Sequence, residues 1–173
     1  FGFLALLAYE VAEISINSYF VIFLTSEGVA TNVEASRLLS LALFIFMGGR
    51  FLGAWVMKFV HPTKVLFCCA VGSVACMCGV LFGGEISLYA LVLNFACEAI
   101  MFPTIFSLSL TGLDAQQKKR ASSYMMMTPV GGCAFLLMGI IADNTSLVLP
   151  FFVPLAGFLI VLSFATYKMK KRN

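Results

Sequence analysis

Charge is scarce in this chain of 173 residues: Asp, Glu, Lys and Arg together make up 11% of it, against about 25% in an average soluble protein. This shortage excludes an ordinary water-covered surface. The few basic residues sit in short loops, not in a continuous patch, so nucleic acid is not expected as a partner. Hydrophobic residues make up 61% of the chain, and the mean hydropathy is +1.02. A soluble core could not bury so much apolar surface, so we expect lipid to surround much of it.

The sequence also lacks the residue sets of an enzyme or a metal centre. The only histidine, His61, stands in a predicted turn beside Pro62, and no nucleophile is paired with a base. Six cysteines are present, but all lie within apolar runs, where Cys behaves as a small hydrophobe, and none has the C-x-x-C spacing of a zinc site. They are Cys68, Cys69, Cys76, Cys78, Cys97 and Cys133. We therefore expect no catalytic residues, no metal and no cofactor.

Six apolar runs are long enough to cross a bilayer as helices. A helix needs about 20 residues to span a hydrocarbon core of ~30 Å. The runs cover approximately residues 1–24, 36–58, 63–82, 86–109, 121–142 and 146–167. Because the connections are short and no soluble linker interrupts them, residues 1–173 are predicted to form one all-α integral membrane domain, a bundle of six transmembrane helices.

Nearly all basic residues fall on one side of this topology. Nine of the eleven Lys and Arg lie after the second, fourth and sixth spans: Lys58, Lys64, Lys118, Lys119, Arg120, Lys168, Lys170, Lys171 and Arg172. Basic loops stay in the cytoplasm, so both ends of this chain are predicted to be cytoplasmic. The chain begins inside an apolar run without the basic region of a signal peptide, and we expect it to be a piece of a longer protein.

Three carboxylates are predicted at membrane depth. Glu10, Glu13 and Asn17 share one face of the first span, and Asn94 and Glu98 share one face of the fourth. An ionisable group costs at least about 2.5–3.5 kcal/mol there and normally faces a cavity or a partner. These groups indicate a polar pathway, although hydrogen bonds that merely hold the bundle together remain an alternative.

Two spans contain helix-weakening residues. Pro103 lies inside the fourth span, and Pro129 precedes Gly131 and Gly132 in the fifth. Proline removes a backbone hydrogen bond and kinks a helix. Together with buried carboxylates, such weak points favour a transporter, whose helices bend around a substrate site.

Four short runs, in order along the chain, carry a more specific pattern. They are Ala12–Tyr19, Met47–Gly53, Met101–Leu108, and a set made of Ala121–Ser123, Gly131–Gly132, Gly139 and Ala142–Asp143. These runs resemble helices seven, eight, ten and eleven of the fucose and glucose/galactose permeases of the major facilitator superfamily. Two positions depart from the family pattern: Met57 lies about where a loop signature carries an acid, and Asn17 replaces a glycine.

The resemblance implies that the chain is the C-terminal six-helix half of a twelve-helix major facilitator fold. It further implies a multi-pass protein of the cytoplasmic (inner) membrane of a bacterium, with lipid and an N-terminal six-helix half as partners. The expected activity is uptake of a hexose or 6-deoxyhexose with protons, by alternating access. The proton-linked acids of the family lie in the N-terminal half, so no coupling role is transferred to Glu13 or Glu98.

On this hypothesis, the sugar meets a polar wall and aromatic rings. Carboxylates and amides match vicinal hydroxyls, and rings match C–H faces. The expected substrate-binding residues are Glu13, Asn17, Asn94, Glu98, Tyr9, Tyr19 and Phe102, and the expected kink or gating residues are Pro103, Gly131, Gly132, Arg50 and Gly53. Two alternatives stay open: an exporter of drugs or other metabolites on the same scaffold, and a structural or accessory membrane subunit.

Overall fold

The computed structural model describes residues 1–172 except 27, 83–84 and 147. Over these residues the chain is built from helices without strands, and six helical stretches are long and apolar enough to cross a membrane. The prediction of an all-α bundle of six spans is therefore confirmed. The elements, in order, are α1 (Gly2–Ser26), α2 (Asn32–Val56), α3 (Pro62–Leu81), α4 (Glu85–Glu98), α5 (Met101–Leu110), α6 (Ala115–Met125), the 3-10 turn η1 (Thr128–Ala134), α7 (Phe135–Asn144), the 3-10 turn η2 (Leu149–Phe151) and α8 (Phe152–Arg172).

Polar capping residues set several helix ends. Thr31 and Glu34 form a capping box at the start of α2, in which the Thr31 amide donates to Glu34 Oε2 at 2.9 Å. His61 caps α3 by accepting from the Thr63 amide at 3.3 Å. The predicted start of the second span at residue 36 was therefore too late, because the capping turn is polar and falls outside the apolar run.

The fourth span is interrupted near its middle. It runs as α4 to Glu98 and resumes as α5 at Met101, so a turn at Ala99 and Ile100 separates two helices within the span that was predicted to kink at Pro103. Pro103 explains the position of the break, because a proline lacks an amide hydrogen and its ring clashes with the carbonyl four residues earlier, here that of Ala99.

The fifth span is also divided, and it begins earlier than expected. Its first helix, α6, starts at Ala115, where the Asp114 amide donates to the Gln117 side chain at 3.3 Å. The 3-10 turn η1 then carries Pro129 and leads into α7. The predicted range 121–142 thus omitted a polar first turn, which hydropathy alone does not assign to a helix.

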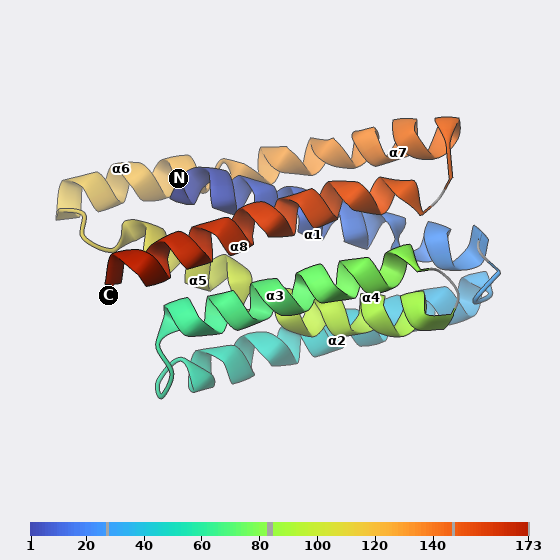
Figure 1. Cartoon of the computed structure of the whole chain (residues 1–173), viewed down its shortest axis with the longest axis horizontal. Coiled ribbons are helices and arrows are strands. Elements are labelled where there is room, and N and C mark those ends of the chain that lie inside the picture. The colour runs from blue at the N-terminus through green and yellow to red at the C-terminus, as the bar shows by residue number, and fades with distance from the viewer. Residues whose placement is uncertain (27, 83–84, 147, 173) are drawn as a thin grey trace.

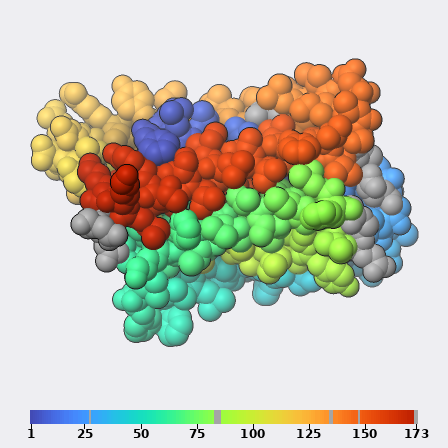
Figure 2. Space-filling model, viewed as in Figure 1, coloured from blue at the N-terminus to red at the C-terminus, as the bar shows by residue number. Residues whose placement is uncertain are grey.

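Helix α1 lies in the middle of the bundle and contacts α2, α5, α7, α8 and η1 (Figure 1). Its closest neighbour is α8: a Cβ added at Gly157 would lie 2.6 Å from the Ala8 carbonyl oxygen and 3.1 Å from Ala12 Cβ. Small residues therefore let the two backbones approach closely, as in other membrane bundles. Figure 2 shows α8 and α3 packed side by side across the visible face, and the two helices are in contact.

Both ends of the chain lie at the same end of the bundle, together with the α2–α3 and α5–α6 connections (Figure 1). The Lys and Arg of these segments are thus gathered on one side, as the charge pattern predicted. Lys168, near the end of α8, donates to the Leu108 carbonyl at 2.7 Å. This bond ties the ends of α8 and α5 together.

Candidate site at the interruption of the fourth span

An acid and an amide lie enclosed at the end of α4. Asn94 and Glu98 both have side chains that are 0% exposed, and Asn94 Nδ2 donates to Glu98 Oε1 at 2.7 Å. The spacing of four residues along a helix places the two side chains one above the other. The other acceptors of the pair, Asn94 Oδ1 and Glu98 Oε2, are buried without a hydrogen-bond partner.

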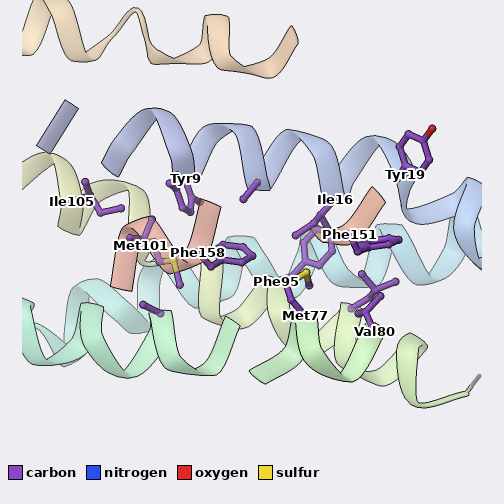
Figure 3. Close-up of a cluster of buried hydrophobic side chains, with 14 of the residues drawn as sticks. Tyr9, Ile16, Tyr19, Met77, Val80, Phe95, Met101, Ile105, Phe151 and Phe158 are labelled. Carbon is purple, nitrogen blue, oxygen red and sulfur yellow. The ribbon is translucent and has the colours of Figure 1, made fainter. Parts of the chain in front are cut away.

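Tyr9 connects α1 to the same point. Its side chain is enclosed in the core beside Met101 and Phe158 (Figure 3), and its hydroxyl donates to the Glu98 backbone carbonyl at 3.1 Å. The centroid of the Tyr9 ring lies 6.3 Å from that of the ring of Phe102, the second residue of α5. Tyr9 thus satisfies a carbonyl at the end of α4 and packs against the start of α5.

A second set of charged groups lies between α1 and α2. Glu13 is beside the Tyr9 hydroxyl and is partly exposed. Arg50 stands close enough to act electrostatically on Glu10 and Glu13. Its guanidinium lies over the Phe46 ring, 4.5 Å from the centroid. A cation held over a ring in this way keeps a defined place at the surface of the bundle.

Helix α2 meets the interruption through glycines. A Cβ added at Gly49 would lie 2.8 Å from Ala99 Cβ, and one at Gly53 would collide with Ile100 Cγ1. These glycines therefore allow α2 to reach the turn that divides the fourth span. On the other side of α1, η1 approaches in the same manner: a Cβ at Gly131 would lie 2.9 Å from Leu7 Cδ1, and one at Gly132 would lie 2.6 Å from Ile14 Cδ1.

The structure does not bring every expected site residue together. Tyr9, Asn94, Glu98 and Phe102 converge at the interruption, with Glu13 beside them. Asn17 lies one helical turn beyond Glu13, with its Oδ1 buried and unpartnered. Tyr19 lies toward the other end of α1 (Figure 3).

Tyr19 belongs to a surface groove between α1 and α7. Ser18, Gly139 and Asp143 line this groove with it, and a Cβ added at Gly139 would lie 3.7 Å from the Tyr19 hydroxyl oxygen. This groove is apart from the polar group around Glu98.

Some buried polar residues, Ser15 and Ser73 among them, were not singled out as site residues from the sequence. Both are buried, and their hydroxyls have no hydrogen-bond partner. Small hydroxyl residues are common in membrane helices, where they often bond to their own backbone, so their presence alone gave no signal. Ser15 does stand on α1 between Glu13 and Asn17, in the stretch with most polar residues.

The arrangement provides acceptors, amide groups and an aromatic edge around a break in a membrane helix. Such a set can bind a neutral polyol or hold a proton, since both require acceptors in a place shielded from water. Among the described residues, no three His, Cys, Asp or Glu side chains stand close enough to hold a metal ion.

Known proteins similar to this chain match it along most of its length. No family model matches it. The L-fucose-proton symporter of Escherichia coli is 31% identical over 170 residues, which cover 95% of this chain and 38% of the symporter. The glucose/galactose transporter of Brucella abortus is 32% identical over 158 residues, covering 89% of this chain and 38% of that protein.

Solved structures with a similar fold point to the same kind of protein. The major facilitator superfamily transporter FucP, in the outward conformation, matches with a TM-score of 0.91 and 31% identity, over 96% of this chain and 41% of FucP. A peptide transporter matches with a TM-score of 0.86 at 14% identity, which supports the fold alone. The chain thus spans about two fifths of the length of the relatives it matches. By sequence along its length and by its six-helix fold, the chain belongs to the major facilitator superfamily, with the fucose and glucose/galactose permeases, and corresponds to one half of such a transporter.

Proposed function

We propose that this chain is the C-terminal half of a permease that takes up a hexose or 6-deoxyhexose together with protons across the inner membrane of a bacterium. The observation that carries the proposal is the 31% identity to the L-fucose-proton symporter over 95% of the chain. A glucose/galactose transporter is equally similar, so the proposed substrate class includes fucose, glucose and galactose. The N-terminal half is the proposed partner. The sugar binds between the two halves, which transport it by alternating access.

In this proposal, α1 and the α4–α5 interruption supply one wall of the sugar site. Glu13 and Asn17 are partly exposed and meet the sugar hydroxyls directly. Phe102, at the start of α5, offers its ring to a C–H face. Asn94 and Glu98 form the inner end of the same wall, behind Tyr9, and become reachable when the interruption opens.

The weak points of the helices are the proposed gating elements. The break near Pro103 lets α5 tilt relative to α4, while Gly53 on α2 allows close sliding past Ile100. Gly131 and Gly132 give η1 the same freedom against α1. Arg50, held over Phe46, completes the charge arrangement on this surface with Glu10 and Glu13.

The test is uptake of labelled L-fucose, glucose and galactose by the full-length protein in proteoliposomes with an imposed inward proton gradient. Glu13→Gln should raise the sugar Kd roughly tenfold or more, since hydrogen bonds to charged groups are worth about 1.5–3 kcal/mol. The matched control is Glu34→Gln, because Glu34 is an exposed capping residue where Gln serves equally well.

Uptake of none of the three sugars by the wild-type protein would refute the sugar assignment. Efflux of lipophilic cations instead would favour the exporter. Equal sugar affinity in the wild type and in Glu13→Gln would leave the family intact but remove Glu13 from the site.

A further inference from the structure

The two unpartnered oxygens of the Asn94–Glu98 pair require an explanation. Asn94 Nδ2 already donates to Glu98 Oε1 at 2.7 Å, while Asn94 Oδ1 and Glu98 Oε2 are both buried acceptors without a donor. Both side chains are 0% exposed. Buried acceptors without a donor are costly, and a buried charge without a partner costs more.

One proton on Glu98 Oε2 resolves both defects. A carboxylic acid and a primary amide are complementary: the amide N–H donates to one carboxyl oxygen, and the acid O–H donates to the amide oxygen. Glu98 and Asn94 already make the first of these bonds. With a proton, Oε2 becomes the donor that Asn94 Oδ1 lacks, and the pair carries no charge.

Among the described residues, the groups that act on Glu98 supply no positive charge in place of that proton. From α1, Tyr9 and Glu13 act on Glu98, and Cys97 does so from α4 itself. From α3, Cys76 lies within the influence of Glu98. The Tyr9 hydroxyl is used by the Glu98 carbonyl. Glu13 would repel a second negative charge nearby.

Arg50, on α2, is directed to other acids. It acts on Glu10, Glu13 and Tyr9, and its guanidinium is held over Phe46. Within the part of the chain that the structure describes, neither Glu98 Oε2 nor Oε1 receives a hydrogen bond from a basic side chain.

We propose that Glu98 and Asn94 form a proton-binding site of this half, which holds one proton between Glu98 Oε2 and Asn94 Oδ1 while α4 and α5 are packed as observed. Glu98 is the last residue of α4, so opening of the interruption admits water to it. The Oε2–H bond then breaks, the electron pair stays on Oε2, and the proton passes to water. The part of this site in transport rests on the proposed function.

Infrared difference spectroscopy on the full-length protein tests the site without any sugar. At neutral pH, the spectrum of the wild type minus that of Glu98→Gln should contain the C=O band of a protonated carboxylic acid. The spectrum of the wild type minus that of the control Glu34→Gln should contain no such band. Glu98→Gln keeps the size of the side chain and both hydrogen bonds to Asn94, so it should fold. Asn94→Leu provides a second arm, because it should shift the same band by removing its partner.

Carboxylate bands in place of the acid band, or an acid band unchanged in Asn94→Leu, would overturn the proposal.

The role of the proton site in transport is measured separately, from the pH dependence of the sugar Kd. One proton whose binding is linked to that of the sugar changes the sugar Kd by up to about tenfold per pH unit. Glu98→Gln should remove the contribution of this proton to the pH dependence. A wild type that shows the acid band but binds no sugar would refute the proposed function and leave the proton site standing. A sugar-binding wild type with an unaltered pH dependence in Glu98→Gln would refute the coupling role.

Discussion

At the scale of single residues, Tyr9 is the group whose loss has the clearest expected cost. Tyr9→Phe keeps the ring contact with Phe102 but leaves the Glu98 carbonyl at the end of α4 without its donor. An unsatisfied buried group costs about 1–3 kcal/mol, so the full-length variant should unfold at a lower temperature in detergent. The midpoint of thermal unfolding, followed by circular dichroism, measures this effect.

The matched control for Tyr9 is Tyr89→Phe. Tyr89 lies on α4 with 71% of its surface exposed, so the same chemical change should leave the unfolding temperature nearly as it was. Equal midpoints for wild type and Tyr9→Phe would mean that the hydroxyl contributes nothing to the junction of α1, α4 and α5.

At the scale of helices, the contact between α1 and α8 predicts a strict size limit. Gly157→Ala would place a methyl group 2.6 Å from the Ala8 carbonyl oxygen, which forces the backbones apart. Overpacking of this kind costs about 1–3 kcal/mol. The expected result is a less stable full-length protein, measured by the yield of monodisperse material after heating and size-exclusion chromatography.

Gly139→Ala serves as the comparison for Gly157→Ala. The added methyl would meet the Tyr19 hydroxyl at 3.7 Å, an ordinary contact, and alanine is favoured over glycine within a helix by about 0.5–1 kcal/mol. This variant should be as stable as the wild type or more so. If both variants lose stability equally, close packing of α1 on α8 is not the cause.

At the scale of the whole molecule, the gathered basic residues predict orientation. The end that carries the α2–α3 and α5–α6 connections should face the cytoplasm, and the α1–α2 connection should face outward. In a cysteine-free full-length protein, a membrane-impermeant maleimide should label Val33→Cys in intact cells. It should label Gln116→Cys only after the membrane is opened. The reverse pattern would show that the chain is inserted the other way.

Much of the architecture was open to prediction from the sequence, because hydropathy and charge act on whole segments. The helix ends were less accurate: the span predicted from residue 36 begins at Asn32, and the one predicted from 121 begins at Ala115. In both cases a capping turn of polar residues extends the helix beyond the apolar run. The kink at Pro103 was predicted, but its displacement to Ala99 and Ile100 follows from the geometry of the lost hydrogen bond.

The assignment of the site residues stays a prediction. The structure shows that Asn94 and Glu98 share one helix face, as their spacing of four predicts, and that their side chains are in contact. Tyr9 was expected to face a sugar, yet its hydroxyl bonds to the Glu98 backbone carbonyl. No side-chain pattern reports that bond, because its acceptor is a backbone group exposed only by the break between α4 and α5.

By itself, the sequence determined that six helices are long and apolar enough to span a membrane, and that basic residues gather at one end. It also predicted which polar groups lie within those helices. Only the tertiary structure decided which face of each helix is enclosed. It placed Asn94 and Glu98 inside the bundle, Glu13 at its partly open surface and Tyr19 in a separate groove. The physical reason is that lipid tails are as apolar as a protein core. A side chain that faces lipid and one that faces a neighbouring helix therefore have the same hydropathy, and only packing distinguishes them.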